Sequence, residues 1–383
     1  MKKAFKFKLL PNDEQKELIN KTLGCCRYVY NNALDHKQKA YKRRKQSLSA
    51  NDLKNLLPHL KKAKPWLAEV DSIALQQSIM RMCDAYTNFF KGRAAYPRFK
   101  RKHDAVASYK TMGTPLYVVN DKYLNIPKLG NVRCKFHRQP QGIIKSATIS
   151  RQAGNYYISL LCEADDEEHY PMTAKTIGID LGIKEFAVDS NGKTYANPKY
   201  LQRSLDKLKR EQQKLSKLTK GSRNYNQQKL KLAKLHLHIS NQRKDYAHKL
   251  SSTLIKENQI ICVEDLDIRS MLKKEDPSHK TRNEKDNNKA RVILDVGWGQ
   301  FVNFLEYKAA WKGRKLIKID RYVPSSQMCN SCKQINPLVK DLSIRQWVCP
   351  KCHTVHDRDY NAAINILNEG LKMAAKSPQR IIN

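Results

Sequence analysis

Four cysteines near the carboxyl end of the chain constrain its fold more than any other feature. They form two C-x-x-C pairs separated by 16 residues: Cys329, Cys332, Cys349 and Cys352. This spacing is typical of a zinc ribbon, in which two knuckles each supply two thiolates to one tetrahedral Zn²⁺ ion. Because four cysteines complete the coordination shell, the sequence predicts one structural zinc ion. His353 and His356 lie close enough to be alternative ligands, but the shell is already full.

The other cysteines indicate a reducing compartment. They are scattered, mostly within apolar patterns, as reduced core thiols would be: Cys25, Cys26, Cys83, Cys134, Cys162 and Cys262. The chain has no apolar window long enough for a transmembrane helix, and its basic start lacks the apolar region and cleavage site of a signal peptide. We therefore expect an intracellular zinc protein without a membrane partner.

The charge of the chain indicates a polyanionic partner. Lys and Arg number 73 against 36 Asp and Glu, a formal net charge of +37. Nucleic acid neutralises such a surplus, and the counterions that it releases favour binding. Residues 199–250 concentrate the charge, with 15 Lys and Arg against three acidic residues. A merely solubilising charge is the alternative, but an enzyme acting on small molecules has little reason to carry so much self-repulsion.

The first half of the chain combines β-strands with a helical block. Residues 3–9 alternate between apolar and charged side chains and predict a strand. Helical periodicity runs from about 13 to 95, and shorter β-like runs follow at 123–127, 131–137, 146–151 and 155–164. Short strands with tight turns predict a small β-barrel, which the first strand completes and into which the helical block is inserted.

The second half follows an acidic run at 165–174, which predicts a domain boundary. The patterns there predict strands and helices in the following order: strands within 176–196, a basic helical hairpin at 199–250, a buried strand at 259–266, an amphipathic helix at 297–312, a strand at 314–323 and a helix at about 358–374. The almost wholly polar stretch 272–290 predicts a mobile loop.

Three carboxylates occupy positions where an acid needs a partner. Asp180 interrupts the apolar strand pattern at 176–183, and Glu264 ends a similar pattern at 260–264. An unpaired carboxylate buried in such a strand is expensive, so each needs a metal, a cation or a shifted pKa. Asp359 stands in the first turn of the last predicted helix, where the helix dipole favours an anion.

Each acid alone is weak support for catalysis, because such residues are more often turn or cap residues. Together, in strand, strand and helix contexts, they fit an RNase-H-like core. Hydrolysis of a phosphodiester by two Mg²⁺ ions needs such a cluster to hold the ions about 4 Å apart. Asp357 competes with Asp359 for the third position, but as the earlier residue it suits the N-cap of the helix.

The motifs of the whole chain resemble one known family. The C-terminal motifs are GIDLGIK, VEDL, PSSQMCNSCK and WVCPKCHTVHDRDYNAAINI, and earlier ones include KAFKFKLLPNDEQKELINKTLG, ALQQS, YPRFKRK, NIPKLG, GWGQF and LEYKAAWKG. This arrangement closely resembles the TnpB (OrfB) proteins of bacterial insertion sequences, which are relatives of the type V CRISPR effector nucleases.

The resemblance implies a multidomain α/β and β fold. Its expected parts are a wedge β-barrel from 1–10 and 100–164, a helical recognition domain from 11–99, a RuvC-like (RNase-H-like) nuclease domain from 175–324 and 356–374, an inserted zinc ribbon from 325–355 and a flexible tail from 375–383. The family's metal carboxylates fall on Asp180, Glu264 and Asp359, and its zinc ligands fall on the four paired cysteines. All three acids are present, so nothing marks a nuclease-dead descendant.

The implied function is an Mg²⁺-dependent, RNA-guided DNA endonuclease. A guide RNA from the transposon end pairs with double-stranded target DNA, one RuvC-type site cuts both strands, and the protein reads a short motif beside the target. No protein oligomer is required, and the resemblance implies a cytoplasmic bacterial protein associated with the nucleoid. Ser72, Gln76 and Gln77 lie in the helix that matches the duplex-reading segment, where amides suit adenine edges, although an exposed polar face is an equal alternative. Arg358 and Asn361 flank the third acid and are expected to position phosphate.

Three other functions fit part of the sequence. A non-cleaving RNA-guided regulator or transposition accessory protein would be expected to have lost one of the acids. A strand-transfer transposase or a resolvase can also use an RNase-H-like core, but would bind transposon ends without RNA. A zinc-ribbon RNA-binding protein without chemistry explains the charge and the cysteines but leaves Asp180 and Glu264 unexplained.

Overall fold

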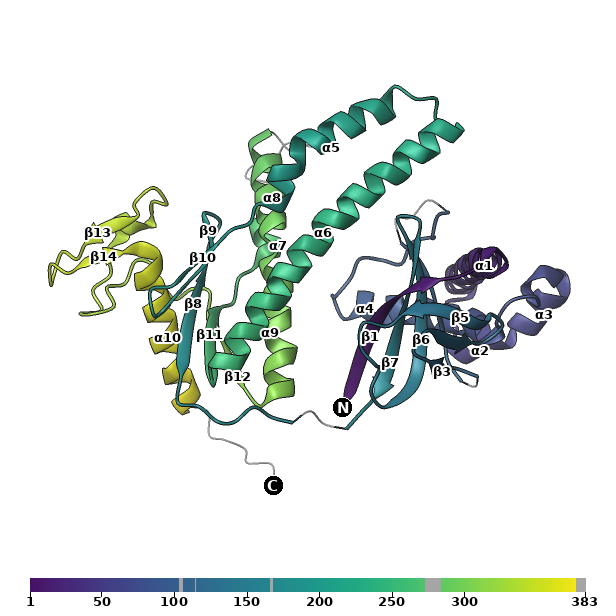
Figure 1. Ribbon diagram of the computed structural model, residues 1–383, viewed down its shortest axis with the longest axis horizontal. Helices are drawn as coiled ribbons and strands as arrows, with labels where there is room; N and C mark the ends of the chain where they lie inside the picture. Colours follow the sequence, from purple (N-terminus) through teal and green to yellow (C-terminus); the bar gives the residue numbers. More distant parts are fainter. Residues whose placement is uncertain (103–105, 114, 166–167, 273–283, 377–383) are drawn as a thin grey trace. The chain divides into compact units, whose positions relative to one another are not determined.

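The structure, a computed structural model, describes residues 1–102, 106–113, 115–165, 168–272 and 284–376. The chain forms two compact units, Met1–Asp166 and Glu167–Asn383, which are described separately (Figure 1). Among the described residues, no helix is both long enough and apolar enough to cross a bilayer.

An antiparallel sheet of seven strands forms the centre of the first unit. In chain order the strands are β1 (Lys2–Leu10), β2 (Ala107–Thr111), β3 (Tyr117–Asn120), β4 (Tyr123–Ile126), β5 (Gly130–Lys135), β6 (Ile143–Gln152) and β7 (Asn155–Glu163). Their spatial order is β2-β6-β7-β1-β5-β4-β3, so the first strand lies at the centre of the sheet. Strict alternation buries Phe5, Phe7 and Leu9, as the sequence predicts. Strands β2 and β3 stand at the two edges, so a closed barrel stays a prediction.

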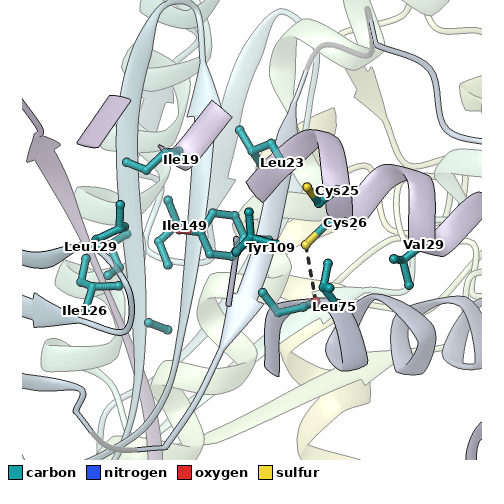
Figure 2. Close-up of a cluster of buried hydrophobic side chains, with 14 of the residues drawn as sticks. Ile19, Leu23, Cys25, Cys26, Val29, Leu75, Tyr109, Ile126, Leu129 and Ile149 are labelled. Carbon is teal, nitrogen blue, oxygen red and sulfur yellow. Dashed lines mark hydrogen bonds between the residues drawn. The ribbon is translucent and has the colours of Figure 1, made fainter. Parts of the chain in front are cut away.

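Helices of the first unit cover this sheet. They are α1 (Asp13–Arg44), α2 (Ala50–Asn55), α3 (Leu57–Ala63), the short 3-10 helix η1 (Pro65–Leu67) and α4 (Ser72–Phe90). Asn12 and Gln15 form a capping box that fixes the start of α1. Figure 2 shows Leu23 and Cys26 of α1 beside Leu75 of α4 and Tyr109 of β2 in the shared core. The Cys26 thiol donates a hydrogen bond to the carbonyl oxygen of Ala74 over 3.5 Å.

A mixed sheet of five strands forms the centre of the second unit. The strands are β8 (Thr176–Leu181), β9 (Glu185–Asp189), β10 (Thr194–Ala196), β11 (Ile260–Glu264) and β12 (Lys315–Ile319), in the spatial order β10-β9-β8-β11-β12. Strands β8, β11 and β12 are parallel, whereas β9 and β10 form antiparallel pairs.

The two faces of this sheet carry different helices (Figure 1). Ile179 and Val263 face α6 (Arg223–Glu257) and α9 (Trp298–Lys312) in one apolar cluster. Residues on the alternate face, such as Gly178 and Cys262, contact α10 (Arg358–Lys376). Because side chains alternate along a strand, each strand divides its residues between the two helical layers.

The predicted basic hairpin consists of α5 (Tyr200–Ser216) and α6, which extend together beyond the sheet (Figure 1). The remaining helices of this unit are α7 (Ile268–Met271) and α8 (Glu284–Val296). The prediction of a mobile loop at 272–290 was wrong from Glu284 onward, because α8 begins there. Buried Ala290, Ile293 and Val296 give that helix an apolar face, which continues past the polar stretch. Residues 273–283, and 377–383 of the predicted tail, lie outside the described part of the chain.

The cysteine-bearing segment lies between β12 and α10. It contains a 3-10 helix, η2 (Pro337–Lys340), and two short antiparallel strands, β13 (Gln346–Val348) and β14 (Val355–Asp357). We call residues 325–355 the zinc-ribbon segment.

Candidate active site and zinc site

Asp180 and Glu264 occupy matching positions at the carboxyl ends of two neighbouring parallel strands. The register of β8 and β11 pairs Ile179 with Val263, so the next positions along the strands are Asp180 and Glu264. Gly178 and Cys262 contact α10, and the two acids lie two residues after them on their strands. Since neighbouring strands lie about 4.8 Å apart, the two carboxylates leave the sheet on the same face and close together.

Helix α10 brings the third acid to this face. A Cβ atom added to Gly178 would lie 2.2 Å from the carbonyl oxygen of Ala363, and one added to Gly370 would lie 2.3 Å from Cys262 Sγ. The helix therefore touches β8 and β11 without an intervening side chain. Asp359, one turn before Ala363 in the first turn of α10, is held beside the ends of these strands.

The charges of the three acids act on one another. Burial raises the pKa of Asp180 to about 7, and the negative charges of Asp359 and Glu264 add to the increase. The positive charges of Arg358 and Arg345 oppose this increase in the pKa of Asp180. Burial also raises the pKa of Glu264. The structure thus concentrates negative charge, which a bound cation would neutralise.

One cation already contacts the cluster. The guanidinium of Arg345, from the zinc-ribbon segment, lies 3.4 Å from Asp359 Oδ1. A second arginine, Arg321, pairs with Asp265 at 2.8 Å and Asp267 at 3.0 Å in the loop that follows Glu264. Neither arginine was predicted from the sequence, because no local pattern shows that they reach acids so distant in the chain.

The acids are spaced more widely than the ligands of a single ion. In the described part of the chain, only the four cysteines bring three or more His, Cys, Asp or Glu ligand atoms within 4.8 Å of one another. Beside Glu264 a cavity of about 270 Å³ opens between the loop after β11 and α9. Its lining includes Asp265, Trp298, Asn303, Glu306 and Lys318.

The four paired cysteines form a compact thiol cluster. The Sγ atoms of Cys329 and Cys352 lie 3.6 Å apart, and those of Cys332 and Cys349 lie 3.5 Å apart. Tetrahedral Zn–S bonds of about 2.3 Å place sulfur atoms about 3.8 Å apart, so the cluster is compatible with one structural zinc ion. A hydrogen bond with Thr354 lowers the pKa of the Cys352 thiol to about 6, which favours the thiolate that zinc requires.

Of the two nearby histidines, only His356 approaches the cluster among the contacts described. Its Nε2 atom lies 3.1 Å from Cys329 Sγ, within reach for the N–H···S hydrogen bond that a metal-bound thiolate accepts. The ring is buried against Trp347, and burial lowers the pKa of His356.

A second face of α10 binds the backbone of the zinc-ribbon segment. Asn361 Nδ2 donates to the Met328 carbonyl over 2.8 Å, and Asn361 Oδ1 accepts from the Asn330 amide over 2.9 Å. Asn365 Nδ2 donates to the carbonyls of Ser325 and Met328. The contacts with Met328 and Asn330 lie on either side of Cys329, so α10 links the cysteine cluster to the three acids.

The expectation that Arg358 and Asn361 position phosphate gains no support from this arrangement. Arg358 is buried and donates to the carbonyls of Asp341 and Ile344, and Asn361 is also buried. Their polar atoms bind the protein backbone. The prediction that Asp357 caps the last helix is confirmed, because its Oδ1 accepts from the Tyr360 amide over 2.9 Å.

The predicted duplex-reading residues lie in the first unit, on α4. Ser72 begins the helix, and its hydroxyl accepts a hydrogen bond from Lys61. Gln76 is exposed, whereas Gln77 is partly buried and its amide approaches Met112 Sδ at 3.7 Å. Gln76 therefore offers the more accessible of the two side-chain amides.

Family models match three parts of the chain. An OrfB family described as "Probable transposase" matches residues 159–275, a "Helix-turn-helix domain" of the same family matches residues 1–46, and a "Cas12f1-like, TNB domain" matches residues 298–366. Residues 1–46 contain a strand and one long helix, α1, rather than two short helices.

Relatives and a solved structure match the chain almost throughout. A protein of Streptomyces pristinaespiralis named "Putative RNA-guided DNA endonuclease" is 36% identical over 380 residues, 98% of this chain and 91% of the relative. One of Escherichia coli K12, named "Putative RNA-guided DNA endonuclease InsQ", is 32% identical, covering 96% and 92%. A solved structure, "Cryo-EM structure of the Cas12f1-sgRNA-target DNA complex", shares the fold, with 13% identity and a TM-score of 0.56, covering 96% of this chain and 99% of that one. This chain belongs to the TnpB (OrfB) family of insertion-sequence proteins.

Proposed function

We propose that this protein is an RNA-guided endonuclease of a bacterial insertion sequence that cuts double-stranded DNA. The observation that carries the proposal is the meeting of three acids distant in the chain. Asp180 and Glu264 stand in register at the carboxyl-terminal ends of two parallel strands, and Asp359 lies in the first turn of the helix that packs on both. The names of the two relatives agree with this activity.

The topology of the second unit supports a RuvC-type core. Three antiparallel strands followed by two parallel ones, in the order β10-β9-β8-β11-β12, correspond to the sheet of an RNase-H-like domain. We propose that residues 175–324 and 356–374 form this nuclease domain and that 325–355 form the inserted zinc ribbon. By the same resemblance, we propose a wedge barrel formed by residues 1–10 and 100–164 and a recognition domain formed by residues 11–99.

The acid cluster suits divalent cations. Its donors are carboxylate oxygens, which Mg²⁺ prefers, and the raised pKa of Asp180 reflects negative charge that a cation would balance. We propose that Asp180, Glu264 and Asp359 hold two Mg²⁺ ions. Ions bound there would activate a water molecule and stabilise the charge that develops on the phosphate.

The protein's own residues orient these ligands. Gly178 and Gly370 fix the distance between α10 and the strands, and the backbone of the zinc-ribbon segment holds the helix from its other face. Arg345 pairs with Asp359 in this arrangement, and we propose that its guanidinium turns to a phosphate group of the bound strand when metal ions occupy the acids.

The partners follow from charge and from the solved relative. The net charge of +37 and the basic α5–α6 hairpin favour nucleic acid. The solved Cas12f1 structure that shares the fold is a complex with an sgRNA and target DNA. We propose a guide RNA from the transposon end and target DNA with a short flanking motif, which Ser72, Gln76 and Gln77 help to read.

Cleavage of DNA matched to the copurifying RNA tests this function. The RNA is sequenced, and a matching target with a randomised flank is incubated with Mg²⁺ or with EDTA. We expect cutting with Mg²⁺ alone and only with some flanks. Asp180→Ala should abolish cutting while RNA binding is kept, because the acid holds metal and not RNA. Asp206→Ala, which removes an exposed acid of α5, is the matched control and should cut normally.

The alternative is a regulator or accessory protein that binds RNA-matched DNA without cutting it. If that is the function, the original protein should bind the target as tightly as the Asp180→Ala variant does. It should cleave no target, whatever the flank. The intact set of acids favours the nuclease. If every flank in the library resists cutting while the matched DNA is bound, the regulator is the correct assignment.

A further inference from the structure

An exposed cluster of aromatic rings lies at the end of α4 in the first unit. We call it the α4 platform, and its members are Tyr86, Phe89, Phe90 and Tyr96. The centroids of contacting rings lie 5.2 to 6.3 Å apart. Tyr86 is buried at the base, whereas Phe90 is 77% exposed and Tyr96 is 50% exposed. Exposed rings gathered in this way mark an interaction surface rather than part of a core.

The chain around the platform is strongly cationic. Residues 85–102 contain six Lys and Arg and no acidic residue. Lys91, Arg93 and Arg98 are exposed within this stretch, and Phe99 beside them is 47% exposed. An apolar partner would gain nothing from these charges, whereas a polyanion that also carries flat rings would use both features.

The platform is held in place, although Tyr96 and the cationic residues that follow Phe90 lie outside regular secondary structure. The hydroxyl groups of Tyr86 and Tyr96 hydrogen-bond over 2.9 Å. Farther along, Asn31 donates to the Lys100 carbonyl over 3.0 Å and accepts from the Lys100 amide over 2.8 Å. The Arg93 amide donates to the Asn88 carbonyl over 2.8 Å. Since these contacts order the segment before any partner arrives, little conformational entropy would be lost on binding.

We propose that unpaired RNA bases stack on Phe90 and Tyr96 while Arg93 and Arg98 contact the adjoining phosphates. Bases in a duplex hide their faces, whereas bases of RNA loops and single strands can be stacked on aromatic side chains. The choice of RNA over other single strands rests on the proposed function, in which the unpaired bases that stay with the protein belong mainly to its guide. The aromatic faces and the positive charge themselves are independent of that function.

Fluorescence anisotropy with a labelled oligouridine RNA of about 15 nucleotides tests the platform, because a site of this kind spans roughly 4–16 nucleotides. The whole protein, freed of RNA, is used in buffer without added Mg²⁺ and without a chelator, so that the proposed structural zinc ion is kept. Phe90→Leu keeps an apolar side chain but removes the ring, and it should weaken binding about 10-fold. Phe90→Trp should restore it, and a duplex of the same length should bind both variants and the original protein alike.

Two further variants and a DNA oligonucleotide serve as controls. Tyr117→Leu removes a 51% exposed ring on β3 and should change nothing. Arg93→Gln should reduce the salt dependence by roughly one phosphate contact. If Phe90→Leu lowers the unfolding temperature, Arg93→Gln tests the same surface without removing a ring. Unchanged affinity in Phe90→Leu and unchanged salt dependence in Arg93→Gln would overturn the proposal, as would an equal loss for single strand and duplex. Tighter binding of oligothymidine DNA would overturn the choice of RNA.

The outcome is separable from the proposed nuclease activity. Because binding of the oligouridine is measured without added Mg²⁺, failure to cut a target would not alter the result. Asp180→Ala should bind the oligouridine with unchanged affinity while it fails to cut a matched target, so a loss of stacking and a loss of cleavage are told apart.

Discussion

Gly178 and Gly370 show how residues without side chains can position residues that carry chemistry. Gly178 lies two residues before Asp180, and Gly370 meets Cys262, which lies two residues before Glu264. A side chain at Gly178 would have to displace a backbone carbonyl, which cannot turn away as a flexible side chain can. The close approach of α10 to the strands therefore depends on glycine.

Gly178→Ala should both destabilise the protein and stop the proposed cleavage. The new Cβ atom, 2.2 Å from the Ala363 carbonyl oxygen, must push α10 from β8, and overpacking of this kind costs about 1–3 kcal/mol. Denaturant unfolding measures the loss. Gly24→Ala in α1 is the control: its Cβ would meet only Arg27, at 4.0 Å, and should be neutral or slightly stabilising. An unfolding midpoint of Gly178→Ala equal to that of the original protein would show that the helix is not so close.

Glu211 contributes pH-dependent stability within the helical hairpin. Hydrogen bonds from Gln228 and Lys231, and then from Lys214, lower the pKa of Glu211 from 4.5 to about 2. An acid whose pKa is lowered by folding stabilises the protein fully above its unfolded pKa. That contribution disappears as the pH falls from about 4.5 to about 2.

Glu211→Gln should therefore lower the unfolding temperature near neutral pH. Its difference from the original protein should shrink as the pH falls towards 2, because the original side chain then becomes neutral too. Gln228→Ala, which removes the first donor and keeps the acid, should give a smaller loss over the same range. A difference that stays constant between pH 2 and 6 would mean that Glu211 acts only through packing.

Among single residues, the sequence predicted the acids of the candidate site better than the residues that contact and position those acids. Asp180 and Glu264 are recognisable because each places a charge in an apolar strand pattern, and Asp357 was correctly assigned as a cap. Arg345, Arg321 and Asn365 were not predicted, because their importance depends on contacts between distant segments. Gly178 gave a weak signal, since a lone glycine in a strand often marks a close approach.

Among the elements, α10 has two packed faces. One carries Ala363 and Gly370 against the sheet, and the other carries Asn361 and Asn365 against the backbone beside Cys329. The helix thus connects the proposed zinc ion with the proposed catalytic acids. A displacement of the zinc-ribbon segment should therefore also displace Asp359.

Asn365→Leu tests this connection. The variant keeps the side-chain volume but leaves the carbonyls of Ser325 and Met328 without this donor, so we expect a loss of about 1–3 kcal/mol in unfolding free energy. Zinc content, measured by a colorimetric chelator, should stay at one ion per chain while the rate of cleavage falls. Asn368→Leu on the same helix is the matched control. Unchanged cleavage in the Asn365 variant would show that the segment does not position Asp359.

Most elements could be predicted from periodicity alone. The strands β1 and β4 to β7, the hairpin α5–α6, and helices α9 and α10 follow the predicted patterns. The short strands β2 and β3 were not specified individually, because their packing partners rather than their own pattern make them strands. The start of α8 was wrongly assigned to a loop, since its apolar face becomes visible only at Ala290.

For the whole molecule, positive charge is the dominant property. The surplus of +37 is spread over both units, and the hairpin α5–α6 concentrates part of it on two helices that extend from the sheet. Affinity for nucleic acid should fall steeply with salt, by a slope of about 0.7–0.9 for each phosphate contacted.

Neutralising part of the hairpin tests its share of this binding. Replacement of Lys229, Lys234 and Arg223 by Gln should reduce the salt slope by up to about 2–3, because each contact releases roughly one counterion. The measurement is RNA affinity at several KCl concentrations. Replacing Lys229 and Lys234 by Arg preserves the charge and should leave the slope unchanged. An identical slope in the neutralised variant would exclude these residues from the RNA interface.

The position of α10 at residues 358–376 has a consequence during synthesis. A ribosome delivers the amino end first, so β8 and β11, with their two acids, emerge long before Asp359. Any polypeptide interrupted earlier would carry the basic surfaces for binding nucleic acid but an incomplete set of acids. If the proposed reaction needs all three, a host cell translating this gene would meet the hazard of a broken chromosome only from chains that extend past Asp359.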